Sequence, residues 1–337
     1  MLIKLKQQIR SDALALLVQK LSQHGMHHCI SQAGDATILG LEQKPAADLL
    51  GEIQAMECVE AVMPIATPFK MASKAFKPNR STIKIKDIEI GGDQIIMMAG
   101  PCAIESEEQL LTIARQLKNA KVSVLRGSAF KPRTSPYSFQ GMGIEGLKIH
   151  KRAQLEHGLV IETEVMDVRD VGVVAEHVDI VRIGARNMQN FNLLKEVGQC
   201  GKPVILKRGM SATVEEWLMS AEYIMAHGNE QVILCERGIR TFENSTRSTL
   251  DLSSVAVAKG MTHLPIIVDP SHAAGRKDII PALSKASVAL GADGLLVEVH
   301  HLPAEAKCDG KQALLPHELA QLSTELNTIA QAIGRHL

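Results

Sequence analysis

Aromatic side chains are scarce in this sequence, which has six Phe, two Tyr and one Trp among 337 residues. Proteins that bind single-stranded nucleic acid stack bases on such side chains, so a nucleic-acid platform is not expected. The 37 basic and 37 acidic residues balance to a formal net charge of zero. No global field therefore attracts nucleic acid or an anionic membrane, and neither is expected as a partner.

Long apolar runs and paired cysteines are also missing. No run approaches the roughly 18 residues that a membrane-spanning helix needs, and the N-terminus lacks the pattern of a cleavable signal. The six cysteines lie far apart and include no C-x-x-C pair, which argues against a disulfide framework. These absences predict a soluble, cytoplasmic protein with an aliphatic core.

Residues 1–65 have the pattern of a small domain of their own. Alternating apolar residues predict strands and helical spacing predicts helices, in the order strand, helix, strand, strand, helix, strand at 2–5, 11–21, 26–30, 37–41, 45–55 and 59–65. This βαββαβ order is that of a ferredoxin-like fold. The segment contains no titratable cluster that suggests catalysis. Binding of a small effector and a plain packing or oligomerisation role are both compatible with it.

Two connecting segments follow. Residues 66–80 carry Pro68, Pro78 and four cations, which predicts a linker with solvated charges. Residues 82–90 predict a β-hairpin ahead of the main domain.

From residue 95 onward, short apolar runs alternate with segments of helical length. The runs lie at 95–99, 122–125, 159–163, 180–183, 204–206, 232–234, 266–268 and 295–297. Eight continuously apolar runs of this kind predict the buried parallel strands of a (β/α)8 barrel. An open doubly wound sheet would place a glycine-rich phosphate-binding turn after the first strand, and Gly100-Pro101-Cys102 is not one. The expected fold is therefore α/β, a TIM barrel over residues 81–337 preceded by the small α+β domain.

Polar side chains follow every one of the eight runs. In chain order these are Cys102, Arg126, Glu164, Arg186, Lys207 with Arg208, Glu236 with Arg237, Asp269 with His272, and Glu298. Active sites of such barrels form at the C-terminal ends of the strands. We therefore expect these side chains to meet at one face of the barrel.

One group of these residues has the chemistry of metal ligands. Cys102, His272, Glu298 and Asp309 offer a thiolate, an imidazole and two carboxylates, a set that suits Mn, Fe, Co or Zn and leaves a position for water or substrate. A small buried cysteine and a polar residue at a helix start are the plain alternatives for Cys102 and His272.

A second group is cationic. The stretch 125–143, LRGSAFKPRTSPYSFQGMG, places several cations and the hydroxyls of Thr134 and Ser135 on a proline-stiffened loop. Six cations at one mouth would repel one another unless anions occupied it, and two phosphate-bearing substrates explain their number: Arg126, Lys131, Arg133, Arg186, Lys207 and Arg237. The backbone amides of Gly184 and Ala185 could add donors. Ion pairing with acidic neighbours, the plain alternative, fits Arg208 and Arg240 better.

Seven motifs carry a family resemblance, and they span almost all of the expected barrel: AGPCAIES at 99–106, LRGSAFKPRTSPYSFQG at 125–141, IGARNMQN at 183–190, KPVILKRG at 202–209, ILCERGIRTFE at 233–243, VDPSHAAGR at 268–276 and VEVHHLPAEAKCDGKQ at 297–312. In these motifs the chain resembles the 3-deoxy-D-arabino-heptulosonate 7-phosphate (DAHP) synthase family, in its short class I form with an N-terminal ferredoxin-like domain. The resemblance implies metal-dependent condensation of phosphoenolpyruvate with D-erythrose 4-phosphate, the first step of the shikimate pathway. It also implies a homotetramer.

Residue roles follow from the same resemblance. It assigns Cys102, His272, Glu298 and Asp309 to one divalent metal ion. It assigns phosphoenolpyruvate to Arg126, Lys131, Ala185, Arg186, Lys207 and Arg237, and erythrose 4-phosphate to Arg133, Thr134 and Ser135. Lys131 and Glu164 are expected to position a water or carry protons, and Asp269 to orient a metal ligand.

Two other functions are alternatives to this one. The sister enzyme that makes 3-deoxy-D-manno-octulosonate 8-phosphate from arabinose 5-phosphate shares the barrel and the first substrate. The K-P-R-T-S run at 131–135 argues against it, because that family carries an Asn-Arg-Ser-type sequence there. A barrel that only senses metabolites is the more distant alternative, and such a barrel would be expected to have lost a metal ligand or this run.

Two hypotheses concern control of activity. Since 1–65 form an extra domain without catalytic groups on a pathway-entry enzyme, we expect it to bind Tyr or Phe and inhibit the barrel. Cys308 adjoins Asp309, which is expected to share a metal with Cys102. The two thiols could therefore form a disulfide when the metal is absent, unless Cys308 points away.

Overall fold

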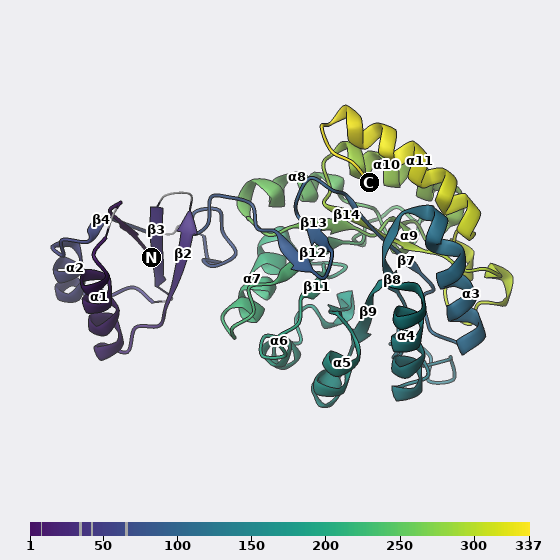
Figure 1. Ribbon diagram of the computed structural model, residues 1–337, viewed down its shortest axis with the longest axis horizontal. Helices are drawn as coiled ribbons and strands as arrows, with labels where there is room; N and C mark the ends of the chain where they lie inside the picture. The colour runs from purple at the N-terminus through teal and green to yellow at the C-terminus, as the bar shows by residue number, and fades with distance from the viewer. Residues whose placement is uncertain (8, 34–35, 42, 65–66) are drawn as a thin grey trace. The chain divides into compact units, whose positions relative to one another are not determined.

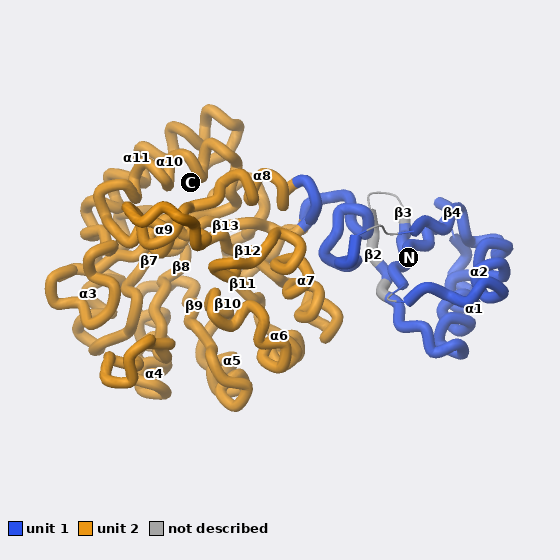
Figure 2. The backbone as a smooth tube through the Cα atoms, turned by 180° about the vertical axis from the view of Figure 1, so that it is seen from behind, with its two compact units in different colours: residues 1–80, 260–263 blue, residues 81–259, 264–337 orange. Residues whose placement is uncertain are grey.

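The computed structural model describes residues 1–7, 9–33, 36–41, 43–64 and 67–337, which form two compact units (Figures 1 and 2). Unit 1 comprises Met1–Arg80 with Gly260–His263, and unit 2 comprises Ser81–Lys259 with Leu264–Leu337. Within the described ranges, every helix is too short or too polar to cross a membrane.

Unit 1 begins with a four-stranded antiparallel sheet in the strand order β2-β3-β1-β4. Its elements are β1 (Leu2–Leu5), α1 (Ser11–Gln23), β2 (His28–Ala33), β3 (Ala36–Leu41), α2 (Ala47–Gln54) and β4 (Val59–Met63). They follow the order expected of a ferredoxin-like fold. Leu17, Leu21 and Ile53 on the helices are buried against Ile3 and Leu5 of the central strand β1. Positions 34, 35 and 65 of the expected turn and last strand lie outside the described residues.

Of the linker expected at 66–80, position 66 lies outside the described residues and the segment 67–80 is packed into unit 1. Phe69, Ala72 and Phe76 are buried, and Phe76 clusters with Leu2 and Ile38. The amide of Lys74 donates to the carbonyl of Met261 at 2.9 Å. The prolines and lysines of this segment suggest a solvated connection, but its apolar side chains between them decide the structure. Its lysines are only partly exposed.

Unit 2 is a closed barrel of eight parallel strands in the order β10-β11-β12-β13-β14-β7-β8-β9, which confirms the predicted fold. The strands are β7 (Ile96–Gly100), β8 (Val122–Arg126), β9 (Val160–Val165), β10 (Ile180–Ile183), β11 (Val204–Lys207), β12 (Val232–Glu236), β13 (Ile266–Val268) and β14 (Gly294–Glu298). The pairing of β14 with β7, Leu296 opposite Met98, closes the ring. The alternative of an open doubly wound sheet is therefore excluded.

Helices surround the strands in Figure 1. The longer ones are α3 (Glu107–Leu117), α4 (Ile144–His157), α5 (Val171–His177), α6 (Phe191–Val197), α7 (Val214–Met225), α8 (Leu252–Met261), α10 (Ile280–Ala289) and α11 (Pro316–Ala332). Side chains set where some of them begin. The Oγ of Ser106 accepts from the amide of Gln109 at the start of α3, and Thr213 forms a capping box with Glu216 at the start of α7.

The barrel interior is apolar at one end. The hairpin of β5 (Ile83–Ile85) and β6 (Ile88–Ile90) places its isoleucines in one buried cluster with Ile96, Val160 and Ile180, near the starts of three strands. Lys86 at the hairpin turn pairs with Asp179, just before β10, at 3.0 Å. The hairpin therefore closes the N-terminal end of the barrel.

Two residues further along the strands, the interior becomes ionic on every strand except β7, where that position is Gly100. Side chains alternate along a strand, so the residues that follow the buried apolar positions at this spacing point inward as well. Among them are Arg126, Glu162, Arg182, Lys207, Asp269 and Glu298, all buried. This charged layer lies toward the C-terminal ends of the strands, where the sequence predicts the site.

Gly100 ends β7 at φ 152°, and a Cβ there would lie 2.1 Å from the carbonyl oxygen of Arg126. We predict that Gly100→Ala lowers the free energy of unfolding by about 2 kcal/mol, because backbone must move to make room. Gly172→Ala in α5 is the matched control, since nothing lies within 4 Å of a Cβ there. It should leave the denaturation midpoint unchanged or raise it slightly. Equal midpoints for both variants in urea would contradict the assignment of close packing at Gly100.

Candidate active site

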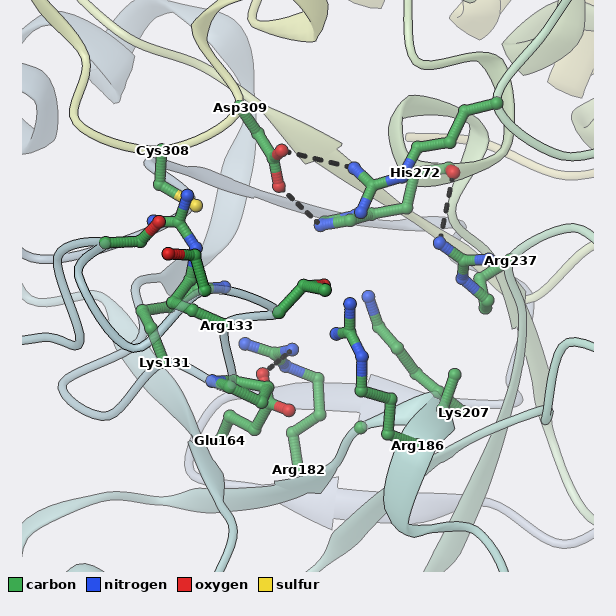
Figure 3. A pocket seen from close by; sticks show the side chains of 17 residues that line it. Lys131, Arg133, Glu164, Arg182, Arg186, Lys207, Arg237, His272, Cys308 and Asp309 are labelled. Atoms are coloured by element: carbon green, nitrogen blue, oxygen red, sulfur yellow. Dashed lines mark hydrogen bonds and ion pairs between the residues drawn. The ribbon is translucent and has the colours of Figure 1, made fainter.

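A cavity of about 280 Å³ lies at the C-terminal ends of the strands (Figure 3). It is lined by residues of seven strands or the loops that follow them: Lys131, Pro132, Arg133, Thr134, Ser135, Ser138, Glu164, Arg182, Gly184, Ala185, Arg186, Lys207, Arg237, Arg247, His272, Cys308 and Asp309. Seven of these carry a cationic side chain and two carry a carboxylate. The cavity is therefore suited to anionic ligands.

The four residues expected to bind metal converge at the edge of this cavity. One ligand atom from each of Cys102, His272, Glu298 and Asp309 lies within 4.8 Å of the others. The Nε2 atom of His272 is 3.3 Å from Glu298 Oε1 and 3.8 Å from Asp309 Oδ2. The thiol of Cys102 is 3.2 Å from Asp309 Oδ2. His272 and Asp309 line the cavity, whereas Cys102 and Glu298 lie beneath them.

Neighbouring groups orient these ligands. The Nδ1 atom of His272, which stands in the short helix α9 (Pro270–Ala274), is 2.7 Å from Asp269 Oδ2. This contact leaves Nε2 to face the cluster, as expected of Asp269. Gln312 donates to Glu298 Oε2, and Arg126 donates to Glu298 Oε1 at 3.0 Å. His272 and Glu298 are therefore each held by a partner outside the set.

The donor set fits a divalent cation. Burial raises the pKa of Glu298 well above its usual value, and the nearby Cys102 and Asp309 raise it further. Burial likewise holds the pKa of the His272 imidazole well below its ordinary value. A bound cation would coordinate the neutral imidazole of His272. It would also favour the ionised form of the acidic groups that lie close together around it.

The thiol of Cys308 points toward Cys102. The two Sγ atoms lie 3.2 Å apart, and Lys131 Nζ is 3.0 Å from Cys102 Sγ. The hydrogen bond with Cys102 lowers the pKa of the Cys308 thiol. The alternative in which Cys308 points away is therefore wrong.

Three of the expected phosphate-binding cations face the cavity from separate strands. Arg186 follows β10 and is exposed. Lys207 ends β11 and is buried, with its Nζ 2.5 Å from Asp269 Oδ2. Arg237, after β12, donates to the carbonyl of His272 at 3.1 Å. Figure 3 shows Arg186 and Lys207 pointing into the same space, opposite His272 and Asp309.

The 131–135 loop forms another wall of the cavity. The amide of Lys131 donates to the carbonyl of Gln140 at 2.9 Å, which folds the loop back on itself. Arg133 donates to the carbonyls of Phe139 at 3.2 Å and Lys307 at 3.4 Å. Thr134 and Ser135 are exposed at the mouth. The loop thus presents a cation and two hydroxyl-bearing residues at one place.

Arg126 does not reach the cavity wall. Its side chain is fully buried, hydrogen-bonded to Glu298 and 3.8 Å from Glu162 through its Nε. Its Nε and Nη2 atoms have no hydrogen-bond partner. Strand alternation explains this placement, because Arg126 is the last residue of β8 and points into the barrel rather than into the following loop.

Sequence reasoning missed two cations that line the cavity. Arg182 interrupts the apolar strand β10, and that interruption was an available signal. Arg247 lies in the loop after β12 and bonds Asp309 Oδ1 and Gln312 Oε1, each at 3.2 Å. No motif distinguishes Arg247 from other loop cations. Arg208 does form the expected ion pairs, at 3.0 Å to Glu236 and to Asp251, but it is buried.

Comparison with protein families identifies one clear match. The sequence profile of the family described as "DAHP synthetase I family" matches residues 74–334. A Thermotoga maritima protein named phospho-2-dehydro-3-deoxyheptonate aldolase is 42% identical over 334 residues, which cover 99% of each chain. A Syntrophotalea carbinolica protein named 2-dehydro-3-deoxyphosphooctonate aldolase is 33% identical over 74% of this chain and 95% of its own.

Solved structures agree with these matches. A crystal structure of the DAHP synthase of Thermotoga maritima superposes with a TM-score of 0.79 at 42% identity, covering 99% of this chain and 98% of that one. A truncated form of 3-deoxy-D-arabino-heptulosonate 7-phosphate synthase from the same organism has a TM-score of 0.74 at 44% identity. It covers 79% of this chain and 98% of its own.

The thiol geometry generates a prediction about oxidation. In the metal-free protein, a mild oxidant such as diamide should take two electrons and two protons from Cys102 and Cys308 and leave a disulfide between them. Activity assayed after metal is restored and two free thiols should be lost together, and divalent metal bound during the oxidation should protect both.

Two variants check this prediction. Cys308→Ser should retain activity under the same oxidant, whereas Cys200→Ser, at a half-buried cysteine outside the cavity, should be inactivated like the parent. Thiol titration alongside activity measures both effects. A Cys308→Ser protein that loses activity as fast as the parent would exclude the disulfide.

Proposed function

The chain belongs to the DAHP synthetase I family, and from this premise we propose that it condenses phosphoenolpyruvate with D-erythrose 4-phosphate. The products are 3-deoxy-D-arabino-heptulosonate 7-phosphate and inorganic phosphate. The observation that carries the proposal is one cavity lined by seven cationic side chains, with a cluster of four potential metal ligands at its edge. Such a cavity can hold two phosphate esters close together, and a single phosphate ester would not require so many cations.

The cations divide into two anion sites. Arg186, Lys207 and Arg237, with the amide of Ala185, would hold the phosphate and carboxylate of phosphoenolpyruvate on the β10–β12 side. Arg133, Thr134 and Ser135 would hold the phosphate of the aldose on the 131–135 loop. Lys207 and Arg237 are buried and already positioned by Asp269 and His272, so little reordering is needed when the substrate binds.

Cys102, His272, Glu298 and Asp309 would hold one divalent ion. When bound, the ion supplies a Lewis acid for the aldehyde oxygen of the aldose phosphate. Asp269 fixes the ring of His272 and Gln312 fixes Glu298. These contacts keep the ligand atoms converged without help from the substrate.

Lys131 and Glu164 are proposed to carry the protons. C3 of phosphoenolpyruvate attacks the aldehyde carbon, a water adds at C2, and phosphate then leaves by cleavage of the C–O bond. Although burial opposes it, Arg182 and Lys131 lower the pKa of Glu164, so its carboxylate can accept the proton of the water. Burial opposes a charged Lys131, but Cys102 and Glu164 raise the pKa of its ammonium group. Lys131 can therefore donate a proton to the alkoxide formed from the aldehyde.

The choice of aldose gives the test of this function. With metal present, we predict that phosphate release from phosphoenolpyruvate strongly favours erythrose 4-phosphate over arabinose 5-phosphate, because residues 131–135 carry the K-P-R-T-S run and not the Asn-Arg-Ser-type sequence of the sister family. A preference for the five-carbon sugar would overturn the assignment of the aldose. No release with either sugar, after metal is restored, would instead favour a barrel that senses metabolites.

Unit 1 is proposed to carry a site for an aromatic amino acid that inhibits the barrel. Two observations support this proposal: the sequence of the unit has no cluster of catalytic groups, and the solved truncated relative covers 79% of this chain. Deleting residues 1–65 should keep activity and abolish inhibition by Tyr or Phe. Since Phe76 packs on Leu2 and Ile38, the deletion is best combined with Phe76→Ser to avoid an exposed aromatic ring. Unchanged inhibition in the shortened protein would refute the proposal.

A further inference from the structure

Arg182 is a charged residue inside an apolar strand. It stands third in β10, between Val181 and Ile183, and only 2% of its surface is exposed. A buried charge is strongly unfavourable unless it is paired and hydrogen-bonded. Its contacts should therefore explain why it is there.

Each nitrogen of the Arg182 guanidinium has its own partner. Nε donates to Glu162 Oε2 at 2.8 Å, Nη1 to Glu164 Oε2 at 3.2 Å, and Nη2 to Ser128 Oγ at 2.8 Å. The partners come from β9 and from the segment after β8. The planar fork is thereby held in one orientation, and it lines the cavity with its edge engaged by Glu164 (Figure 3).

Glu164 is confined on its other side by Gly184. A Cβ at Gly184 would lie 2.0 Å from Glu164 Oε1, so only a glycine lets the carboxylate lie against the backbone there. Arg182 holds Oε2 while Gly184 makes room for Oε1. The observed orientation of the carboxylate therefore depends on the hydrogen bond from Arg182 and on the absence of a side chain at Gly184.

The charges facing Glu164 come from several strands. Arg182 of β10, Lys131 after β8, Lys207 of β11 and Arg126 of β8 all favour its ionised form against the effect of burial, and Arg182 has the largest influence among them. Arg182 also connects through Glu162 to Arg126, which contacts Glu298 of the metal-ligand set. A chain of alternating charges therefore joins the two functional groups of the cavity.

We propose that Arg182 is a positioning residue for the reaction and that it holds the Glu164 carboxylate in the orientation in which it faces the cavity. The inference rests on the proposed function, in which Glu164 accepts the proton of the water. It assigns a role to a strand residue that binds neither substrate nor metal.

The pH dependence of kcat tests this inference, measured with saturating substrates and metal on Arg182→Gln. Glu164 is active when ionised, so the acidic limb of the profile follows its pKa, and loss of the arginine raises that pKa. We expect the limb to move upward by about one pH unit and kcat to fall about tenfold or more. KM for phosphoenolpyruvate should change less than about twofold, because the substitution removes no contact that binds the substrate in the ground state.

Further variants keep the test decisive if Arg182→Gln folds poorly. The double variant Glu162→Gln/Arg182→Gln removes one charge of each sign and should shift the limb in the same direction. Arg182→Lys keeps the charge and should retain most of the profile. A raised KM with unchanged kcat and limb would make Arg182 a substrate ligand and overturn the inference.

Arg208→Gln is the matched control. Arg208 is also buried at a strand end and also bridges two carboxylates, Glu236 and Asp251, but it does not line the cavity. Its loss should lower the unfolding midpoint and leave the pH profile unmoved. If Arg182→Gln behaves in the same way, Arg182 is only a structural ion pair and the inference fails.

Glu164→Gln separates this failure from that of the proposed function. The acidic limb should disappear in this variant, together with most of the activity. If Glu164→Gln keeps the parent kcat and profile, the proposed role of Glu164 falls and the role of Arg182 falls with it. If the limb disappears in Glu164→Gln but stays in place in Arg182→Gln and the double variant, only the inference about Arg182 is overturned.

Discussion

Pairing of buried charges inside the barrel is the constraint on which the rest of the site depends. Parallel strands alternate their side chains, so the apolar layer closed by the N-terminal hairpin is followed two residues later by arginines, lysine and carboxylates with little access to water. Each such charge must find a partner or it destabilises the fold by several kcal/mol. Arg126 with Glu298, Arg182 with Glu162, and Lys207 with Asp269 meet this requirement.

These pairs also determine which atoms remain available for chemistry. Asp269 engages one nitrogen of His272 and leaves the other to face the metal-ligand cluster. Arg126 and Gln312 engage Glu298 from either side. These contacts therefore orient the candidate ligand atoms in the absence of metal and substrate. Electrostatic catalysis requires preorganisation of this kind. The cations left facing the cavity are the ones that we propose bind the anionic substrates.

Much of this arrangement could be predicted from the sequence, for a physical reason. Strands buried on both faces are continuously apolar, so all eight could be located, and the residues after them could be assigned to one face. The pairings could not be predicted, because a lone charge in a strand, such as Arg182, does not identify its partner. Arg126 was expected at the cavity mouth and lies beneath it, because it is the last residue of β8 and points into the barrel. The contact of Arg247 with Asp309 joins two loops and depends on tertiary structure alone.

The most direct test of this account is a Co²⁺ titration of the metal-free protein followed by absorption spectroscopy. A thiolate ligand gives a charge-transfer band in the near ultraviolet, so the convergence of Cys102, His272, Glu298 and Asp309 on one ion predicts such a band that saturates at one equivalent. It should be absent in Cys102→Ser. Binding without a thiolate band, or no saturable binding, would contradict the claim that the paired interior prepares a single metal site.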